Sequence, residues 1–277
     1  MINKNIIYNK NCIKGMLDLP DNSVQMILTD PPYLVNYKDR LGRSVANDMA
    51  SNSDWLIPAF NEMYRVLENN RYAVVFYGWN EVDKFVNAWR KAGFRIIGHF
   101  VFYKKYASNA RTVKKHMEYR HECAYLLAKG YPQSCEVLPS VMGWNYTGNE
   151  FHPTQKPVDL LLKLINAFCP TGGIVLDSFM GSASTALACI QSEIFDYLGY
   201  ELDNNYFNIA MSRINEKSNK LRQVVSQESP KHKVIKPHYK YNLQNKKPES
   251  KNRRLPPPAN DDYFINRARK MQGVQNG

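Results

Sequence analysis

The sequence lacks the long apolar runs and the cysteine pairs that mark membrane and secreted proteins. None of its 277 residues belongs to a run near the ~20 apolar residues of a spanning helix, and the start, MINKNIIYNKNC, has no secretory signal pattern. The five cysteines are widely spaced and never form C-x-x-C, which argues against a disulfide framework and a zinc cluster. We expect a soluble, cytoplasmic protein with no metal site and no membrane partner.

Acidic residues are scarce at the C-terminal end. Residues 216–277 hold 15 Lys and Arg against 5 Asp and Glu, a net +10, so the remaining 22 basic and 20 acidic residues leave only +2. This stretch is rich in Lys, Asn, Gln and Pro, a composition that cannot bury a core. We predict one folded domain over 1–215 and a basic, flexible tail over 216–277. The tail is either a solubilising segment or a nucleic-acid arm, and Tyr239 and Tyr241 among its basic residues favour the second.

Apolar, β-branched runs alternate with amphipathic segments, which predicts an α/β fold with a mostly parallel sheet. Two of these runs, within 94–129, are joined by a basic piece without helical period, so we expect an antiparallel hairpin at one sheet edge. The predicted strands cover 5–9, 24–29, 72–78, 94–104, 123–129, 173–178 and 196–202. The predicted helices cover 55–67, 81–92, 157–168 and 183–191.

The first strand end of chemical interest reads TDPPY, residues 29–33. Pro31 and Pro32 have no N–H and a fixed φ, so the chain can neither extend the strand nor begin an ordinary helix there. Such a stiff turn would hold the Asp30 carboxylate, the Pro31 carbonyl and the Tyr33 ring in fixed relation. The alternative is a proline-rich turn with an incidental acid.

A second strand closes on Asp177, turns around Gly181 and opens a helix near Ala183, and Glu201 ends the next strand 24 residues after Asp177. An acid at this spacing is placed to bind ribose hydroxyls. The turn is not G-x-G-x-x-G, which disfavours a dinucleotide, and an acid at the strand end suits an ammonium group. S-adenosylmethionine combines an ammonium group and a ribose without phosphate. A purely structural glycine turn is the alternative.

Four motifs together resemble the β-group DNA amino-methyltransferases, above all the adenine-N6 enzymes of bacteria, phages and mobile elements. The likeness covers about residues 5–215, with RHECAYLLAKG (120–130) as further support. It implies a Rossmann-like class I methyltransferase fold whose seven-stranded, mostly parallel sheet has one reversed strand, in circularly permuted motif order. The motifs are TDPPY (29–33), HPTQKPVDLLLKLI (152–165), VLDSFMGSAST (175–185) and GYELDNNYFNIAMSRI (199–214).

The resemblance implies transfer of a methyl group from S-adenosylmethionine to the N6 amine of an adenine flipped out of double-stranded DNA. Asp30, Pro31, Pro32 and Tyr33 would be catalytic. His152 would either act directly or anchor its loop. The residues expected to bind the cofactor are Asn11, Cys12, Asp30, Thr154, Gln155, Lys156, Asp177, Phe179, Gly181, Ser182 and Glu201.

Three residues of the predicted cofactor motifs depart from the family pattern. Asn11 replaces an acid that accepts from the adenine of the cofactor, Ser178 replaces a proline, and Ala183 replaces a second glycine. A Cβ at Ala183 crowds a close ligand approach or a residue with positive φ, so cofactor affinity is the property most affected.

Basic residues in two loops are expected to contact DNA phosphates, with solvated loops as the alternative. The insert at about 131–151 is short for target recognition. The resemblance leaves open a homodimer and a cognate restriction endonuclease. The candidate phosphate contacts are Lys38, Arg40, Arg43, Lys104, Lys105, Arg111, Lys114 and Lys115.

Three other functions are alternatives to adenine-N6 methylation of DNA. N4-cytosine enzymes usually carry Ser before P-P-Y, so Asp30 favours adenine. RNA guanine-N2 enzymes have the cofactor motif first in the chain. A non-catalytic DNA-binding protein of the same fold would explain Ser178 and Ala183.

Deleting residues 220–277 is expected to weaken DNA binding and to flatten its dependence on salt, because each phosphate contact releases counterions. Binding titrations over a range of salt concentrations measure both. An unchanged slope would make the segment a solubilising tail.

Overall fold

The computed structural model describes residues 2–38, 42–49, 51–105, 119–133 and 136–227. All described elements belong to one compact unit, Met1–Ser229, which is the first unit of the chain. Most of the predicted basic tail, residues 228–277, lies outside the described residues.

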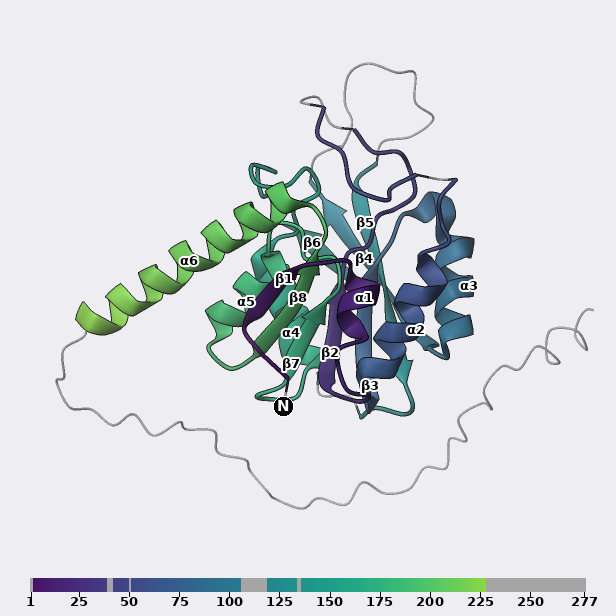
Figure 1. The fold of residues 1–277 in the computed structure, drawn as a ribbon, viewed down its shortest axis with the longest axis horizontal. Helices are drawn as coiled ribbons and strands as arrows, with labels where there is room; N and C mark the ends of the chain where they lie inside the picture. The colour runs from purple at the N-terminus through teal and green to yellow at the C-terminus, as the bar shows by residue number, and fades with distance from the viewer. Residues whose placement is uncertain (1, 39–41, 50, 106–118, 134–135, 228–277) are drawn as a thin grey trace, which may run out of the picture. The chain divides into compact units, whose positions relative to one another are not determined.

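The described part of the chain forms one sheet in the order β1-β8-β7-β2-β3-β5-β4-β6 (Figure 1). Neighbouring strands pair in parallel except where β5 meets β3 and β4. β5 is therefore the one reversed strand among those described, as the 94–129 segment predicted. The strands are β1 (Ile6–Asn9), β2 (Val24–Thr29), β3 (Leu67–Phe76), β4 (Arg95–Lys104), β5 (His121–Lys129), β6 (Val141–Trp144), β7 (Ile174–Asp177) and β8 (Asp196–Glu201).

Helices cover both faces of the sheet, and each face has its own apolar core. Along β2, Met26 and Leu28 enter one core while Ile27 enters the other, as expected for a strand buried on both sides. Residues of α4, α5 and α6 pack in the first core, and residues of α1, α2 and α3 in the second. The helices are α1 (Cys12–Met16), α2 (Leu56–Val66), α3 (Val82–Ala92), α4 (Val158–Phe168), α5 (Ser184–Ser192) and α6 (Asn204–Gln227), with a 3-10 turn η1 (Trp79–Glu81).

The predicted strands and helices are all present, and the structure adds the strand β6, the helices α1 and α6, and the 3-10 turn η1. The sheet has eight strands rather than seven, because part of the 131–151 insert forms β6 beside β4. β6 has only four residues, two of which are exposed, and its sequence did not predict a strand. The short helix α1 was also missed. Helix α6 continues past residue 215, so the first compact unit extends further than the predicted domain boundary. No helix among the described residues is long and apolar enough to span a bilayer.

A buried lysine ties helix α2 to the start of β3. Lys129, 6% exposed, donates from Nζ to the carbonyls of Tyr64 at 2.8 Å and Leu67 at 2.7 Å, and to Asn22 Oδ1 at 2.8 Å. The last carbonyls of a helix have no partner within it, and the ammonium group supplies one. Burial lowers the pKa of Lys129.

Replacing this ammonium group should destabilise the protein. We expect Lys129→Met to lower the free energy of unfolding by about 2–4 kcal/mol, because buried carbonyls lose their donors. Denaturant titration measures the change. The control Lys163→Met alters an exposed lysine of α4 and should change the same free energy by no more than about 0.5 kcal/mol. Equal effects would show that the Lys129 contacts do not stabilise the fold.

Candidate active site

The ends of four parallel strands bring the sequence motifs to one edge of the sheet. β2 pairs with β7, β7 with β8, and β8 with β1, so Asp30, Asp177, Glu201 and Asn11 lie at neighbouring strand ends. In open α/β sheets, ligands bind at this edge, where the winding reverses. A cleft of about 1170 Å³, including its open mouth, lies there.

The cleft brings together every residue predicted to be catalytic or to bind the cofactor. Segments more than 100 residues apart in the chain meet on its walls. The predicted residues that line it are Asn11, Cys12, Asp30, Pro31, Pro32, Tyr33, Thr154, Gln155, Lys156, Asp177, Phe179, Gly181, Ser182 and Glu201.

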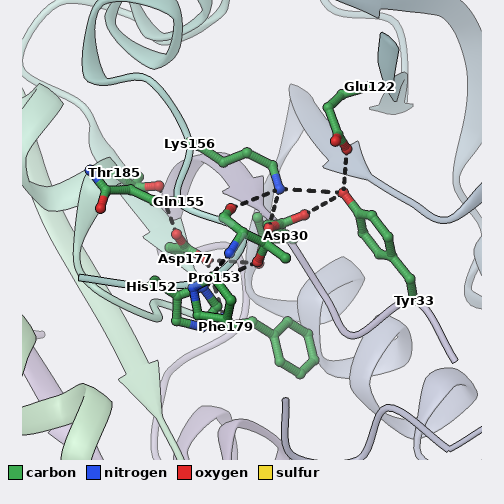
Figure 2. Close-up of polar contacts among 12 residues, drawn as sticks. Asp30, Tyr33, Glu122, His152, Pro153, Gln155, Lys156, Asp177, Phe179 and Thr185 are labelled. Carbon is green, nitrogen blue, oxygen red and sulfur yellow. Dashed lines mark hydrogen bonds and ion pairs between the residues drawn. The ribbon is translucent and has the colours of Figure 1, made fainter. Parts of the chain in front are cut away.

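The Asp30 carboxylate lies at the centre of a charged hydrogen-bond network (Figure 2). Its Oδ2 accepts from Lys156 Nζ, and its Oδ1 accepts from the Tyr33 hydroxyl at 2.7 Å. Burial raises the pKa of Asp30, and Lys156 opposes that shift. The Tyr33 pKa is raised well above its usual value, first by burial and then by the Asp30 charge. Lys156 was predicted to bind cofactor, and the structure adds this ion pair.

Close packing fixes the turn after β2. A Cβ on Gly78 would lie 2.7 Å from Tyr33 Cβ, so this position requires glycine. Two residues after the prolines, the chain enters the left-handed region at Leu34 and Asn36. The buried Asp48 carboxylate accepts from the backbone N–H of Val35 at 3.3 Å and of Tyr37 at 2.7 Å. These contacts fix the path of the chain beside the catalytic turn.

Asp177 joins three segments of the cleft wall. It accepts from the hydroxyls of Thr29 at 2.8 Å and Thr185 at 2.7 Å, and from the Phe179 backbone N–H at 3.1 Å. Burial raises the pKa of Asp177 to about 6 despite these donors. The side chain thus links the ends of β2 and β7 to helix α5.

Glu201 holds the glycine turn against the end of β8. Its carboxylate accepts from the backbone N–H of Gly181 at 2.7 Å and of Asp203 at 2.8 Å. Burial raises its pKa to about 7. Gly181 has a φ of 53°, the left-handed region in which glycine carries no steric cost.

The HPTQKP segment closes the cleft from another side. His152 packs on the Tyr206 ring at 4.3 Å, and its Nδ1 accepts from the Thr154 backbone N–H at 3.2 Å. Burial lowers the pKa of His152 from 6.5 to about 3, helped by the positive charge of Lys156. Gln155 Oε1 is a buried acceptor without a partner among the residues that the structure describes, although its residue lines the cleft. A buried unpaired acceptor beside a cleft suits a ligand that brings a donor.

The structure gives each departure from the family pattern a physical setting. Asn11 Oδ1 accepts from the Lys14 backbone N–H at 3.2 Å and so caps helix α1. The Ser178 hydroxyl is buried against Met16 Sδ at 3.6 Å. Ala183 has a φ of 69°, and its side chain is fully buried in the first core rather than lining the cleft. Its cost is therefore backbone strain, of about 1–2 kcal/mol for a left-handed residue with a Cβ.

The candidate DNA contacts are only partly described. Lys104 is 6% exposed and paired with Glu122, which differs from the expected phosphate contact. Arg43 donates to the carbonyls of Asn149 and Glu150, both at 3.2 Å. Lys38 lies in a bridge with Ser44, and Lys105 is exposed. Arg40, Arg111, Lys114 and Lys115 lie outside the described residues.

Sequence reasoning missed the part that Glu122 plays. Its carboxylate accepts from Lys104 and lies 3.5 Å from the Tyr33 hydroxyl. The RHECAYLLAKG stretch supports the family resemblance, but it does not show that Glu122 on β5 lies beside the turn that follows β2. Within the described ranges, no group of three or more His, Cys, Asp and Glu side chains could hold a metal ion.

The permuted sheet and its cleft of strand-end acids define a protein of the class I methyltransferase fold. The chain belongs to the DNA methylase family, whose model matches residues 24–212. YubD of Escherichia coli (strain K12), which bears the name of a methylase, is 50% identical over 205 residues, covering 74% of this chain and 87% of YubD. The DNA adenine methyltransferase YhdJ of the same strain is 26% identical over 250 residues, with 76% and 82% covered.

Solved structures share the fold. The complex of M1.HpyAVI with S-adenosylmethionine has a TM-score of 0.60 at 22% identity and covers 76% of this chain and 98% of its own. The cytosine-N4-specific PvuII DNA methyltransferase has a TM-score of 0.60 at 15% identity, with 78% and 92% covered. The predicted fold class and family are confirmed, and the fold alone does not identify the target base.

The buried, uncharged His152 should make the stability of the protein depend on pH. The unfolded chain takes up a proton on this imidazole below pH 6.5, whereas the folded chain does so only near pH 3. The stability that His152 contributes is therefore complete above pH 6.5 and is lost as the pH falls toward 3. We expect His152→Gln to reduce the slope of the unfolding free energy between pH 6 and 4 by about 1.4 kcal/mol per pH unit.

Denaturant titrations at several pH values measure this slope. Thr154→Val is the matched control, because it removes a hydroxyl 3.1 Å from His152 Nδ1 and no titrating group. It should change stability without changing the slope. A slope unaltered by His152→Gln would contradict the buried, neutral imidazole.

Proposed function

We propose that this DNA methylase transfers a methyl group from S-adenosylmethionine to the N6 amine of an adenine flipped out of double-stranded DNA. The observation that carries the proposal is the Asp30 carboxylate at the end of β2, inside the cleft and beside the Pro31 carbonyl. An extruded base brings an amine with two hydrogens, and this corner offers two acceptors. The prolines remove two backbone donors at the point where the ligand supplies donors.

The cleft fits the proposed cofactor. When bound, S-adenosylmethionine supplies a methyl group activated by a sulfonium. We assign Asp177 and the backbone of Phe179–Gly181 to its methionine end, Glu201 to its ribose, and Thr154 and Gln155 to further contacts. The orphan acceptor Gln155 Oε1 and the acids Asp177 and Glu201 support this assignment, because acceptors suit hydroxyl, amine and ammonium groups.

The side chains around Asp30 would prepare the amine for methylation. Asp30 and the Pro31 carbonyl each accept one N–H, which draws the nitrogen lone pair out of conjugation with the ring and orients it. Tyr33 stacks on the extruded base, a contact worth ~1–3 kcal/mol in comparable cases. Lys156 stabilises the ionised form of Asp30 while the amine is absent. After transfer, Asp30 or water takes the proton that the amine loses.

Adenine is favoured over cytosine by the acid at position 30, since N4-cytosine enzymes of this fold usually carry Ser there. Methylation of N4 of cytosine is the second candidate, because a cytosine-specific enzyme is among the structural neighbours. Digestion of methylated DNA to nucleosides, followed by mass spectrometry, separates the two. We expect N6-methyladenine, and N4-methylcytosine would overturn the choice of base.

Substitutions at the two strand ends should separate chemistry from cofactor binding. We expect Asp30→Asn to slow methyl transfer by about 10²–10⁴-fold and to leave the affinity for S-adenosylmethionine within about threefold, which is about 0.65 kcal/mol. Asp177→Asn should weaken that affinity first, because it disturbs the turn that we assign to the cofactor. Labelled methyl transfer and calorimetric titration measure the two quantities.

Asp83→Asn is the control, because it changes an exposed acid on α3 and should alter neither quantity. Equal loss of transfer and of cofactor affinity in Asp30→Asn would contradict the division of roles between the strand ends.

A further inference from the structure

The Tyr33 hydroxyl lies between two carboxylates that come from different strands (Figure 2). It donates to Asp30 Oδ1 at 2.7 Å, and Glu122 Oε2 lies 3.5 Å from the same oxygen. Asp30 follows β2, whereas Glu122 belongs to the reversed strand β5. A hydroxyl carries one proton, so it can donate fully to only one of these carboxylates at a time.

Both oxygens of Asp30 are engaged in this structure. Lys156 donates to Oδ2, and the Tyr33 hydroxyl donates to Oδ1. Each oxygen keeps a second lone pair for an incoming amine, but the amine then shares that oxygen with a donor already bound to it. Lys156 also donates toward the Tyr33 hydroxyl oxygen at 3.4 Å. Among the described residues that contact this hydroxyl, Glu122 is the acceptor other than Asp30, since Lys156 has only protons to donate.

Lys104 holds Glu122 in place. Its ammonium group pairs with Glu122 Oε1, and the lysine side chain is 8% exposed. The same ammonium lies 5.0 Å from the centre of the Trp144 ring on β6. With one oxygen bound to this buried cation, Glu122 keeps its second oxygen directed at Tyr33. A buried ion pair is costly to form, so its position beside the catalytic turn suggests more than a surface role.

We propose that Glu122 is a positioning residue for the transfer reaction: it accepts the hydrogen bond from the Tyr33 hydroxyl when the target amine binds to Asp30 Oδ1. When the hydroxyl rotates toward Glu122, its hydrogen bond moves from Asp30 to Glu122 and Oδ1 is left entirely to the amine. The covalent O–H bond stays intact. Lys156 remains on Oδ2 and stabilises the ionised carboxylate. This inference rests on the proposed function, because it assumes that an amine binds at Asp30.

A double-mutant cycle tests the exchange. We expect Glu122→Gln to slow single-turnover methyl transfer about tenfold, equivalent to about 1.4 kcal/mol, because a neutral amide oxygen is a weaker acceptor than a carboxylate. Glu122→Gln keeps the size of the side chain and an acceptor for Lys104. In the Tyr33→Phe background no hydroxyl competes for Asp30, so the same change should alter the rate by less than about twofold, the usual limit of additivity.

Two results would overturn the inference. One is that Glu122→Gln slows methyl transfer by the same factor in the Tyr33 and the Tyr33→Phe backgrounds, and the other is that it has no effect on the rate when Tyr33 is present. Thermal unfolding and cofactor affinity, measured for each variant, show whether a rate change reflects misfolding. Should Glu122→Gln fail to fold, Lys104→Met with Glu122→Gln removes both members of the ion pair and enters the same cycle. Glu193→Gln, on the exposed C-terminal end of α5, is the matched control.

The wild-type protein separates this inference from the proposed function. If it transfers no methyl group to the N6 amine of adenine or the N4 amine of cytosine, the proposed function fails. If it transfers the group and the two backgrounds respond alike, only the role of Glu122 is wrong.

Discussion

The parallel pairing of β2 with β7 is the constraint on which the site depends. Met26 lies opposite Val175 and Ile27 opposite Leu176, so segments about 150 residues apart end side by side. A hydrogen bond from the Thr29 hydroxyl to Asp177 extends the contact beyond the ladder. A register shift of one residue would turn these buried strands to opposite faces and would separate Asp30 from Asp177. The cleft therefore exists only in this register.

Burial of like charges sets the chemistry of the cleft. Asp177 and Glu201 have pKa values raised to about 6 and 7 because water is excluded around them. Burial raises the pKa of Asp30 as well, but Lys156 pairs with this carboxylate and opposes the shift. In the proposed reaction, an ionised acceptor is needed at Asp30, whereas Glu201, which we assign to the ribose, can accept a hydrogen bond in either state. The distribution of cations in the cleft fits this difference.

Sequence reasoning succeeded where local pattern and strand ends carry the information. Seven strands and four helices follow from apolar runs and from proline and glycine turns, and the residues predicted to be catalytic or to bind the cofactor all line the cleft. Sequence reasoning failed where an element or a contact depends on tertiary structure. β6 has only four residues, with a mixed burial pattern, and its pairing with β4 is a tertiary contact. The Lys104–Glu122 pair depends on a strand reversal, and Lys104 in a basic stretch looked like a phosphate contact.

Tyr33 shows why the contacts that the sequence did not predict lie next to the catalytic turn. The motif predicts its ring as a stacking surface, but the ring and the hydroxyl point to different partners. Gly78 leaves no room for a side chain beside the Tyr33 Cβ, and the hydroxyl lies between Asp30 and Glu122. A phenylalanine would stack equally well without competing for Asp30. The tyrosine hydroxyl is therefore an extra donor that the site has to accommodate, and the acid on β5 is the group placed to accept it.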